Sequence, residues 1–306
     1  MPSKKRSTDA PRETGEQLAK VALARRKKAL RRRKAAIAKM PKTKAAKSAS
    51  PAVKAGQSAG ILVAEGDSWF DYPFNDIIKN LEDDHGFDVE TVAHAGDRVE
   101  DMAYSGGQLD DFIRRIEKLK RRGEKPRAIL LSGGGNDITG EIEFGMILNH
   151  ALSPINGLNP LVVEGIIDQR LHDAFSTILA AVTTVCEEHF GEKIPIVVHG
   201  YDYAIPDGRG FAGGFWLLPG PWLEPGFNQK GYHNMVVRRQ LVEKLIDRFN
   251  EMLKRLTGTP EFRHVSFVDL RRTLKSANYK TDWANELHPT ATGFAAVTAR
   301  IAAAIP

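Results

Sequence analysis

The stretch Gly60-Ile61-Leu62-Val63-Ala64-Glu65-Gly66-Asp67-Ser68 is a short apolar run that ends in glycine and polar residues. A run of this length between glycines is typical of a β-strand that is buried on both faces. Four comparable runs follow, and the last two are rich in β-branched residues, which favour strands. They lie at residues 88–93, 127–131, 194–199 and 264–268. The chain is therefore predicted to contain a sheet of five strands.

Helical patterns separate these strands. Between residues 108 and 122 the apolar side chains recur at spacings of three and four, which marks one buried helix face. Further helices are predicted at 75–84, 161–189, 232–256 and 290–304. Strands that alternate with helices in this way favour a doubly wound α/β fold with a parallel sheet. We therefore expect residues 57–306 to form one domain.

Residues 1–56 differ in composition from this domain. The first 60 residues hold 18 of the 44 Lys and Arg residues but only three of the 38 Asp and Glu residues, so the remainder of the chain is net acidic. The densest runs are Arg25-Arg26-Lys27-Lys28 and Arg31-Arg32-Arg33-Lys34. Such a segment buries little apolar area and its like charges repel, which predicts a disordered basic arm. The arm could dock a polyanion or a protein partner, act as a transit peptide, or serve only as a solvated tail.

The composition also excludes some classes of protein. The single cysteine, Cys186, cannot form an internal disulfide or a Cys-based metal cluster, and it indicates a reducing compartment. No run approaches the roughly 18 apolar residues that a membrane helix requires, and no apolar segment follows the basic N-terminus as in a Sec signal peptide. We therefore expect a cytoplasmic globular protein of undetermined oligomeric state.

Polar residues gather where the predicted strands end. In open parallel sheets, ligands bind outside the carboxyl ends of the strands. These polar segments lie at residues 65–70, 94–97 and 132–137, and after the last strand at 282–289. The segment 201–231, which follows the fourth strand, is rich in Gly, Pro and aromatic residues. We expect this long loop to be a lid or pocket wall, or else a locally packed loop without a ligand.

Four short motifs stand at these strand ends in a fixed order. Gly66-Asp67-Ser68 follows the first strand, Gly96 the second, and Gly134-Gly135-Asn136-Asp137 the third, while His288-Pro289 lies near the C-terminus. Together they resemble the SGNH (GDSL-like) hydrolase family over about residues 60–304. The resemblance implies a flavodoxin-like three-layer sandwich and serine-dependent hydrolysis of esters, such as carbohydrate O-acetyl, acyl-lipid or thioester bonds. It implies neither a metal ion nor an organic cofactor.

The residue types themselves also point to this chemistry. A serine hydroxyl is a poor nucleophile near neutral pH and needs a base to accept its proton, a task that suits histidine. Of the nine histidines, His288 alone lies in a turn just before a helix late in the chain, where the chain should return beside the first strand. We predict that Ser68 is the nucleophile of an acyl-serine mechanism and that His288 is its base and then its acid.

An oxyanion hole is the second requirement, because attack on an ester places negative charge on the carbonyl oxygen. The family pattern implies that its donors are the backbone N–H groups of Ser68 and Gly96 and the side-chain amide of Asn136. Asp67 and Asp137 are expected to hold their loops in shape by hydrogen bonds rather than to transfer protons.

One position departs from the family pattern. The family usually has Asp three residues before the histidine, and here Asn285 occupies that position. Asn285 could complete a weakened triad, or a carboxylate could come from Asp282 or, failing that, Glu286. A dyad oriented by a backbone carbonyl is the third alternative. The sequence therefore predicts an esterase of reduced rate. The alternatives are an inactive binding module and a nucleic-acid-binding protein that acts through its basic arm.

Overall fold

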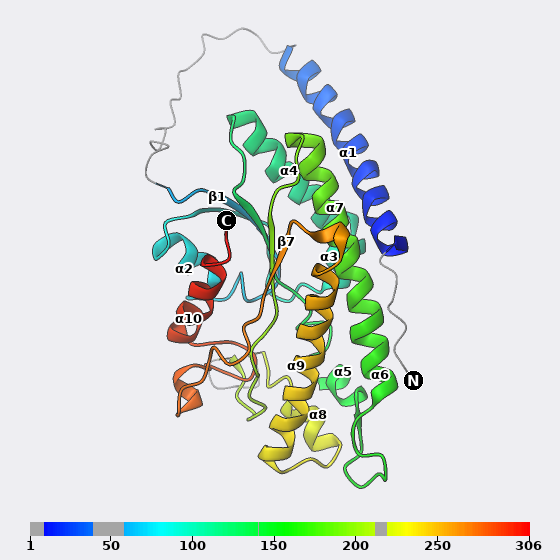
Figure 1. Cartoon of the computed structure of the whole chain (residues 1–306), viewed down its shortest axis with the longest axis vertical. Coiled ribbons are helices and arrows are strands. Elements are labelled where there is room, and N and C mark those ends of the chain that lie inside the picture. Colours follow the sequence, from blue (N-terminus) through cyan, green and yellow to red (C-terminus); the bar gives the residue numbers. More distant parts are fainter. Residues whose placement is uncertain (1–8, 39–57, 140, 212–218) are drawn as a thin grey trace.

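A five-stranded parallel sheet lies at the centre of the computed structural model, which describes residues 9–38, 58–139, 141–211 and 219–306 (Figure 1). The strand order is β2-β1-β3-β6-β7, and every neighbouring pair is parallel. The strands are β1 (Ile61–Glu65), β2 (Asp88–Thr91), β3 (Ala128–Leu131), β6 (Ile196–His199) and β7 (Val265–Val268). Each lies within a predicted run, so the doubly wound α/β fold is confirmed.

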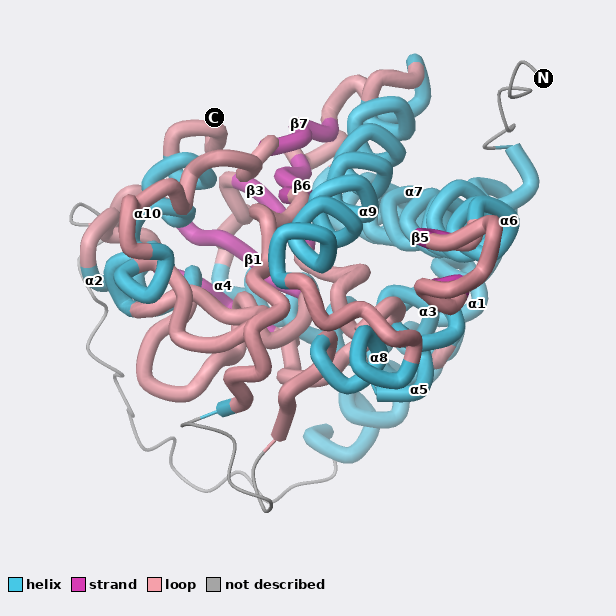
Figure 2. Tube along the Cα trace, turned by 90° about the horizontal axis from the view of Figure 1, so that it is seen from below, coloured by secondary structure: helices cyan, strands magenta, loops and turns pink. Residues whose placement is uncertain are grey.

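Helices cover both faces of this sheet. On one face α2 (Ile77–Asp83) contacts α10 (Ala291–Ala302), and on the other α7 (His172–Phe190) contacts α4 (Gly106–Arg122) and α9 (Met235–Thr257). Figure 2 shows α2 and α10 on one side of the strands and α7 and α9 on the other. The sheet and its two helical layers form the expected three-layer sandwich.

Shorter helices and a small hairpin connect the main elements of the sandwich. The helix predicted at 161–189 is divided into three successive segments: α6, a π-helical stretch η1, and α7. A small antiparallel hairpin precedes it. These elements are α3 (Val99–Tyr104), α5 (Glu141–Met146), β4 (Leu148–Asn149), β5 (Gly157–Leu158), α6 (Pro160–Val163), η1 (Glu164–Leu171), α8 (Glu224–Gln229), η3 (Pro260–Phe262) and η4 (Tyr279–Thr281).

The apolar pattern of the sequence accounts for the core. Leu62, Val63 and Ala64 of β1 are completely buried, as expected for a strand covered on both faces. On α4 the predicted stripe of Phe112, Ile113, Ile116 and Leu119 is also buried. At the start of α10, the Thr290 hydroxyl accepts a hydrogen bond from the backbone N–H of Gly293 at 3.1 Å. This N-cap, two residues after His288, fixes where the helix begins.

A thirty-residue helix, α1 (Asp9–Ala38), packs on the outside of α7 and α4. The prediction of a disordered arm over residues 1–56 is therefore wrong for residues 9–38; residues 1–8 and 39–56 lie outside the described ranges. Small residues explain the packing, because Ala19 and Ala22 are buried and a Cβ on Gly15 would lie 2.1 Å from the carbonyl oxygen of Thr177. The backbone of α1 thus lies directly against α7.

A buried ion pair also holds α1 in place. Arg26 donates to Glu117 of α4 at 2.7 Å, and the Glu117 side chain is only 4% exposed. Arg25 donates to Asp110 of the same helix at 3.0 Å. Two cations of the predicted arm, Arg25 and Arg26, are therefore paired with acids of the domain, which the composition of residues 1–56 alone does not reveal.

The long segment between β6 and α9 contains α8 and passes over the carboxyl end of the sheet. Residues 212–218 of this predicted aromatic loop, including Phe215 and Trp216, lie outside the described part. Within the described ranges, no helix combines the length and the apolar character needed to cross a bilayer.

Candidate active site

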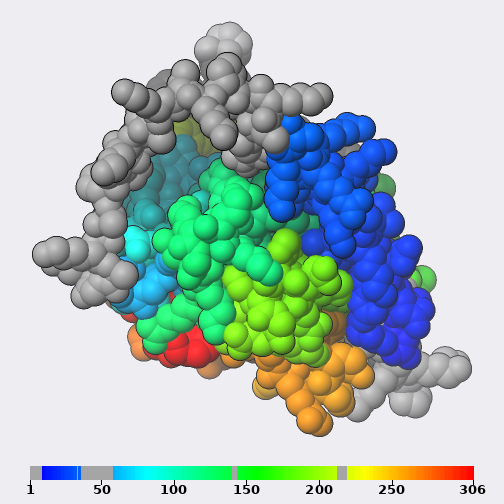
Figure 3. All heavy atoms as spheres, turned by 90° about the horizontal axis from the view of Figure 1, so that it is seen from above, coloured from blue at the N-terminus to red at the C-terminus, as the bar shows by residue number. Residues whose placement is uncertain are grey.

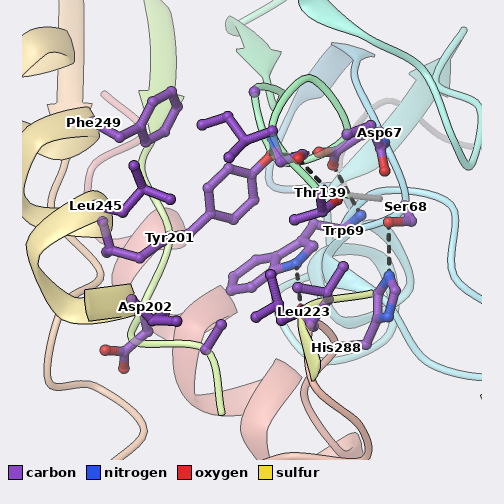
Figure 4. Close-up of a pocket in the computed structure, with 18 of the residues that line it drawn as sticks. Asp67, Ser68, Trp69, Thr139, Tyr201, Asp202, Leu223, Leu245, Phe249 and His288 are labelled. Carbon is purple, nitrogen blue, oxygen red and sulfur yellow. Dashed lines mark hydrogen bonds between the residues drawn. The ribbon is translucent and has the colours of Figure 1, made fainter. Parts of the chain in front are cut away.

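The loops that follow β1, β2 and β3 meet the turn before α10 at one edge of the sheet (Figure 4). The β1 loop requires a glycine, because a Cβ on Gly66 would lie 2.8 Å from the side chain of Ser132. In the β3 loop Gly134 has φ 103°, and a Cβ there would lie 2.6 Å from the ring of Phe249. These glycines allow the two loops to pack tightly around the site.

Asp67 anchors the loop that carries Ser68. Its buried carboxylate accepts hydrogen bonds from the backbone N–H of Trp69 at 3.0 Å and from the Ser132 hydroxyl at 2.8 Å. It also accepts a hydrogen bond from the hydroxyl of Tyr201, which lies two residues after the end of β6. Asp67 therefore ties together the chain segments after β1, β3 and β6, which agrees with a structural role.

The side chains of Ser68 and His288 meet, although 220 residues separate them. The distance from Ser68 Oγ to His288 Nε2 is 2.8 Å. The His288 ring is buried, and the backbone carbonyl of its neighbour Leu287 accepts a hydrogen bond from the Trp69 indole at 3.1 Å. The turn before α10 is thus fastened to the loop after β1, and the pair has the geometry of a nucleophile and its base.

Asn285 lies against the other ring nitrogen of His288. Its Oδ1 is 3.0 Å from His288 Nδ1, and it accepts the backbone N–H groups of Leu287 at 3.0 Å and His288 at 2.8 Å. Its amide nitrogen donates to the hydroxyl of Tyr72 at 2.9 Å. Because backbone N–H groups can only donate, the oxygen of Asn285 must face them and the ring. The ring therefore carries its proton on Nδ1, which leaves Nε2 free to accept the proton of Ser68.

Two aromatic rings enclose His288. The Tyr72 ring stacks on the imidazole with centroids 4.2 Å apart and planes inclined by 17°, and Trp222 approaches edge-on at 5.5 Å. Burial lowers the pKa of His288 from 6.5 to about 3, because the charged form loses its hydration. The free site thus holds a neutral imidazole, ready to accept a proton but without a carboxylate to stabilise the resulting charge.

The other two candidates for the third triad position bind elsewhere. The carboxylate of Asp282 accepts the backbone N–H and the hydroxyl of Ser276, each at 2.7 Å. The buried carboxylate of Glu286 accepts backbone N–H groups at 208 and 222–224, at 2.6 to 3.1 Å. Both acids accept hydrogen bonds from backbone N–H groups of the surrounding loops. Of the three candidates, Asn285 is the one whose side chain faces the imidazole of His288.

The predicted oxyanion donors lie around the same loops. The turn containing Gly96 is held beside the β1 loop, since the backbone N–H of His94 donates to Gly66 at 3.0 Å. Gly96 itself has φ 92°. Asn136 donates one amide hydrogen to the carbonyl of Asp97 at 2.9 Å, and its second amide hydrogen is left for another acceptor. Asp137 caps the start of α3 by accepting the backbone N–H of Val99 at 2.9 Å.

A cavity that is partly open to solvent adjoins this site and is lined by Ser68, Asn136 and His288. Figure 4 shows Trp69 between Ser68 and the wall formed by α9. The far wall is apolar and comes largely from α9, whose buried face the sequence indicates only as core. Its apolar lining includes Ile138, Phe144, Leu223, Val242, Leu245 and Phe249. Gly96 is not among the described residues that line the cavity.

The sequence reasoning missed Tyr72 and Trp222 as neighbours of the base. Tyr72 lies only four residues after Ser68, so the sequence could have placed it near the nucleophile. Trp222 lies in the aromatic loop, but its position follows from the Glu286 contacts, which no local pattern predicts. Groups of three or more His, Cys, Asp or Glu side chains able to hold a metal ion were not found among the described residues.

The fold and the motifs together define a hydrolase of the SGNH type with an α/β fold. Residues 56–296 match the model of the GDSL-like Lipase/Acylhydrolase family, and the chain belongs to this family. No curated protein matches the chain.

Three solved structures are similar to the chain at low identity. A protein provisionally assigned as a GDSL-like lipase from Parabacteroides merdae is 13% identical, with a TM-score of 0.46 over 82% of this chain and 98% of the other. An alpha/beta hydrolase from the metagenome of Lake Arreo is 16% identical, with a TM-score of 0.43 over 81% and 95%. A catalytic mutant of an acetylxylan esterase from Geobacillus stearothermophilus is 14% identical, with a TM-score of 0.41 over 81% and 94%.

Proposed function

We propose that this hydrolase cleaves carboxylic esters through an acyl-enzyme formed on Ser68. The observation that carries the proposal is the 2.8 Å contact between Ser68 Oγ and His288 Nε2, with Asn285 Oδ1 on the opposite ring nitrogen. His288 accepts the serine proton as Oγ bonds to the ester carbonyl carbon, and it then returns the proton to the departing alcohol. Water activated by the same imidazole attacks the acyl-serine and releases the carboxylic acid.

The oxyanion of each tetrahedral intermediate is met by the backbone N–H groups of Ser68 and Gly96 and by Asn136. Asn136 suits this role because its bond to the Asp97 carbonyl fixes the amide plane while one hydrogen stays available. Donors held in place in this way stabilise the transition state without having to reorganise.

The substrate that fits best is an ester with an apolar acyl group. The cavity beside Ser68 has apolar walls contributed by α9, Phe144 and Leu223, and apolar groups gain free energy when such surfaces leave water. A hydrocarbon acyl chain would occupy the cavity, with the alcohol part directed to solvent.

A fluorophosphonate probe tests the proposal. We expect covalent labelling of the full-length protein and no labelling of Ser68→Ala, with Ser266→Ala, at an exposed position of β7, as the matched control that retains labelling. Hydrolysis of p-nitrophenyl esters by the unlabelled wild type, lost once Ser68 is labelled, would support the esterase. A folded protein that resists the probe would instead favour a binding module that keeps the pocket without the chemistry.

A further inference from the structure

The outward face of α1 carries six exposed cations, here called the α1 basic face: Lys20, Lys27, Lys28, Arg31, Arg32 and Lys34. They lie away from the buried positions Ala19 and Ala22. Figure 3 shows α1 on the molecular surface beside α4 and α7. The face is therefore available to a partner from solvent.

No acidic side chain of the described residues pairs with the α1 basic face. The sequence contains no Asp or Glu between Glu16 and Glu65. Within the described part of the chain, none of the six cations forms an ion pair, whereas Arg25 and Arg26 are paired with acids of α4. Like charges three and four residues apart destabilise a helix, so contacts of the opposite face hold this array in place.

Contacts of Gly15, Ala22 and Arg26 anchor the first part of α1, and the continuous helix sets the spacing of the cations beyond Arg26. Lys27, Arg31 and Lys34 follow one another at spacings of four and three, so they share one side of the helix, roughly 5 to 6 Å apart along its axis. Duplex nucleic acid carries one negative charge per about 1.7 Å of its axis. A fixed row of cations can therefore meet successive phosphates without first becoming ordered.

The apolar pattern of α1 favours nucleic acid over a membrane. A helix that lies on a bilayer inserts an apolar face bearing residues such as Leu, Phe or Trp. On α1 the small apolar side chains face α7, and Val21, at 48% exposed, is the large apolar residue most open to solvent in the described helix. We infer that the α1 basic face binds the phosphate backbone of duplex nucleic acid without reading its sequence.

This surface lies away from the hydrolase site. In Figure 1 the C-terminal half of α1 is at the end of the molecule opposite α8 and the loops beyond the strands. A bound duplex would leave Ser68 accessible, so the inference neither depends on the esterase proposal nor fails with it.

Fluorescence anisotropy of the full-length protein with a labelled 20-base-pair DNA duplex of arbitrary sequence tests the inference. If all six cations contact phosphates, affinity should fall by about three orders of magnitude between 50 and 200 mM salt. The triple substitution Lys27→Gln, Arg31→Gln and Lys34→Gln should reduce the salt slope by about half. The matched control changes three exposed lysines on other faces to Gln, namely Lys244, Lys254 and Lys275, and should bind like wild type.

Three results would overturn the inference. They are affinity that is insensitive to salt, a triple variant that binds as tightly as its control, and binding to phosphatidylserine vesicles in place of the duplex. Circular dichroism of both variants establishes that they are folded. Labelling of Ser68 by the fluorophosphonate should be unchanged in the presence of saturating duplex. The esterase proposal and the duplex-binding inference are therefore tested separately.

Discussion

Asn285→Asp should increase the rate of ester hydrolysis. The asparagine already selects the productive tautomer, because its oxygen faces Nδ1 of His288 together with two backbone N–H groups. In serine proteases the reverse change costs about four orders of magnitude, largely through the wrong tautomer. In this protein the tautomer is already correct, so Asn285 costs only the negative charge that a carboxylate would place beside the protonated His288. Asn285→Asp restores that charge.

The size of the gain follows from the geometry. The Oδ1 to Nδ1 distance is 3.0 Å, and a carboxylate and an imidazolium about 4 Å apart between charge centres attract by about 4 kcal/mol at an effective dielectric constant of about 20. Burying the new carboxylate at a position only 1% exposed opposes part of this. The Tyr72 hydroxyl, which accepts from Asn285, can rotate to donate to Asp. We expect kcat to rise by about 10- to 100-fold.

Steady-state hydrolysis of a p-nitrophenyl ester measures this effect across pH. The variant should also shift the acid limb of its kcat profile to higher pH, because the carboxylate raises the pKa of His288. Asn278→Asp is the matched control, since Asn278 is an exposed helix cap that accepts from Lys280 and tolerates Asp. A folded Asn285→Asp enzyme with unchanged or lower kcat, and with an unshifted profile, would refute the reasoning.

Four further outcomes are expected. Asn136→Ala should lower kcat by about a hundredfold or more with the fold intact, because it removes a transition-state donor; equal turnover would remove Asn136 from the oxyanion hole. In wild type, kcat/KM should stay level from about pH 7 down to about pH 5, since the pKa of His288 is lowered to about 3, and an acid limb near pH 6.5 would contradict this. Because the unfolded imidazole binds its proton at higher pH than the folded one, urea unfolding should show stability falling as pH drops from about 6.5 towards 3. Leu245→Trp should fill the cavity and reduce hydrolysis of octanoyl esters about tenfold relative to acetyl esters, and a uniform change in both rates would argue against an acyl pocket there.

The sheet could be predicted from sequence because each buried strand is a short apolar run between polar turns. β1 illustrates this, as its glycines and the following Asp67 mark both ends. The proximity of Ser68 and His288 could also be predicted, because both residues follow strands of a parallel sheet and the carboxyl ends of such strands lie on the same side.

What could not be predicted depends on contacts between distant segments. The cationic residues of α1 indicate disorder when considered alone, and only Glu117 and the close approach of Gly15 to α7 account for its docking. Asp282 and Glu286 were plausible partners of His288 because carboxylates suit that role. Their actual hydrogen-bonding partners are backbone groups and a serine hydroxyl whose positions are set by the folded loops.

The docking of α1 bears on how the protein is best prepared. The family match begins at residue 56, which invites a recombinant chain trimmed to that boundary. Such a chain would expose the surface of α7 against which Gly15 packs, and the buried Glu117 would lose its ion pair with Arg26. Poor solubility of the trimmed protein would then reflect a missing structural layer rather than a defective hydrolase domain.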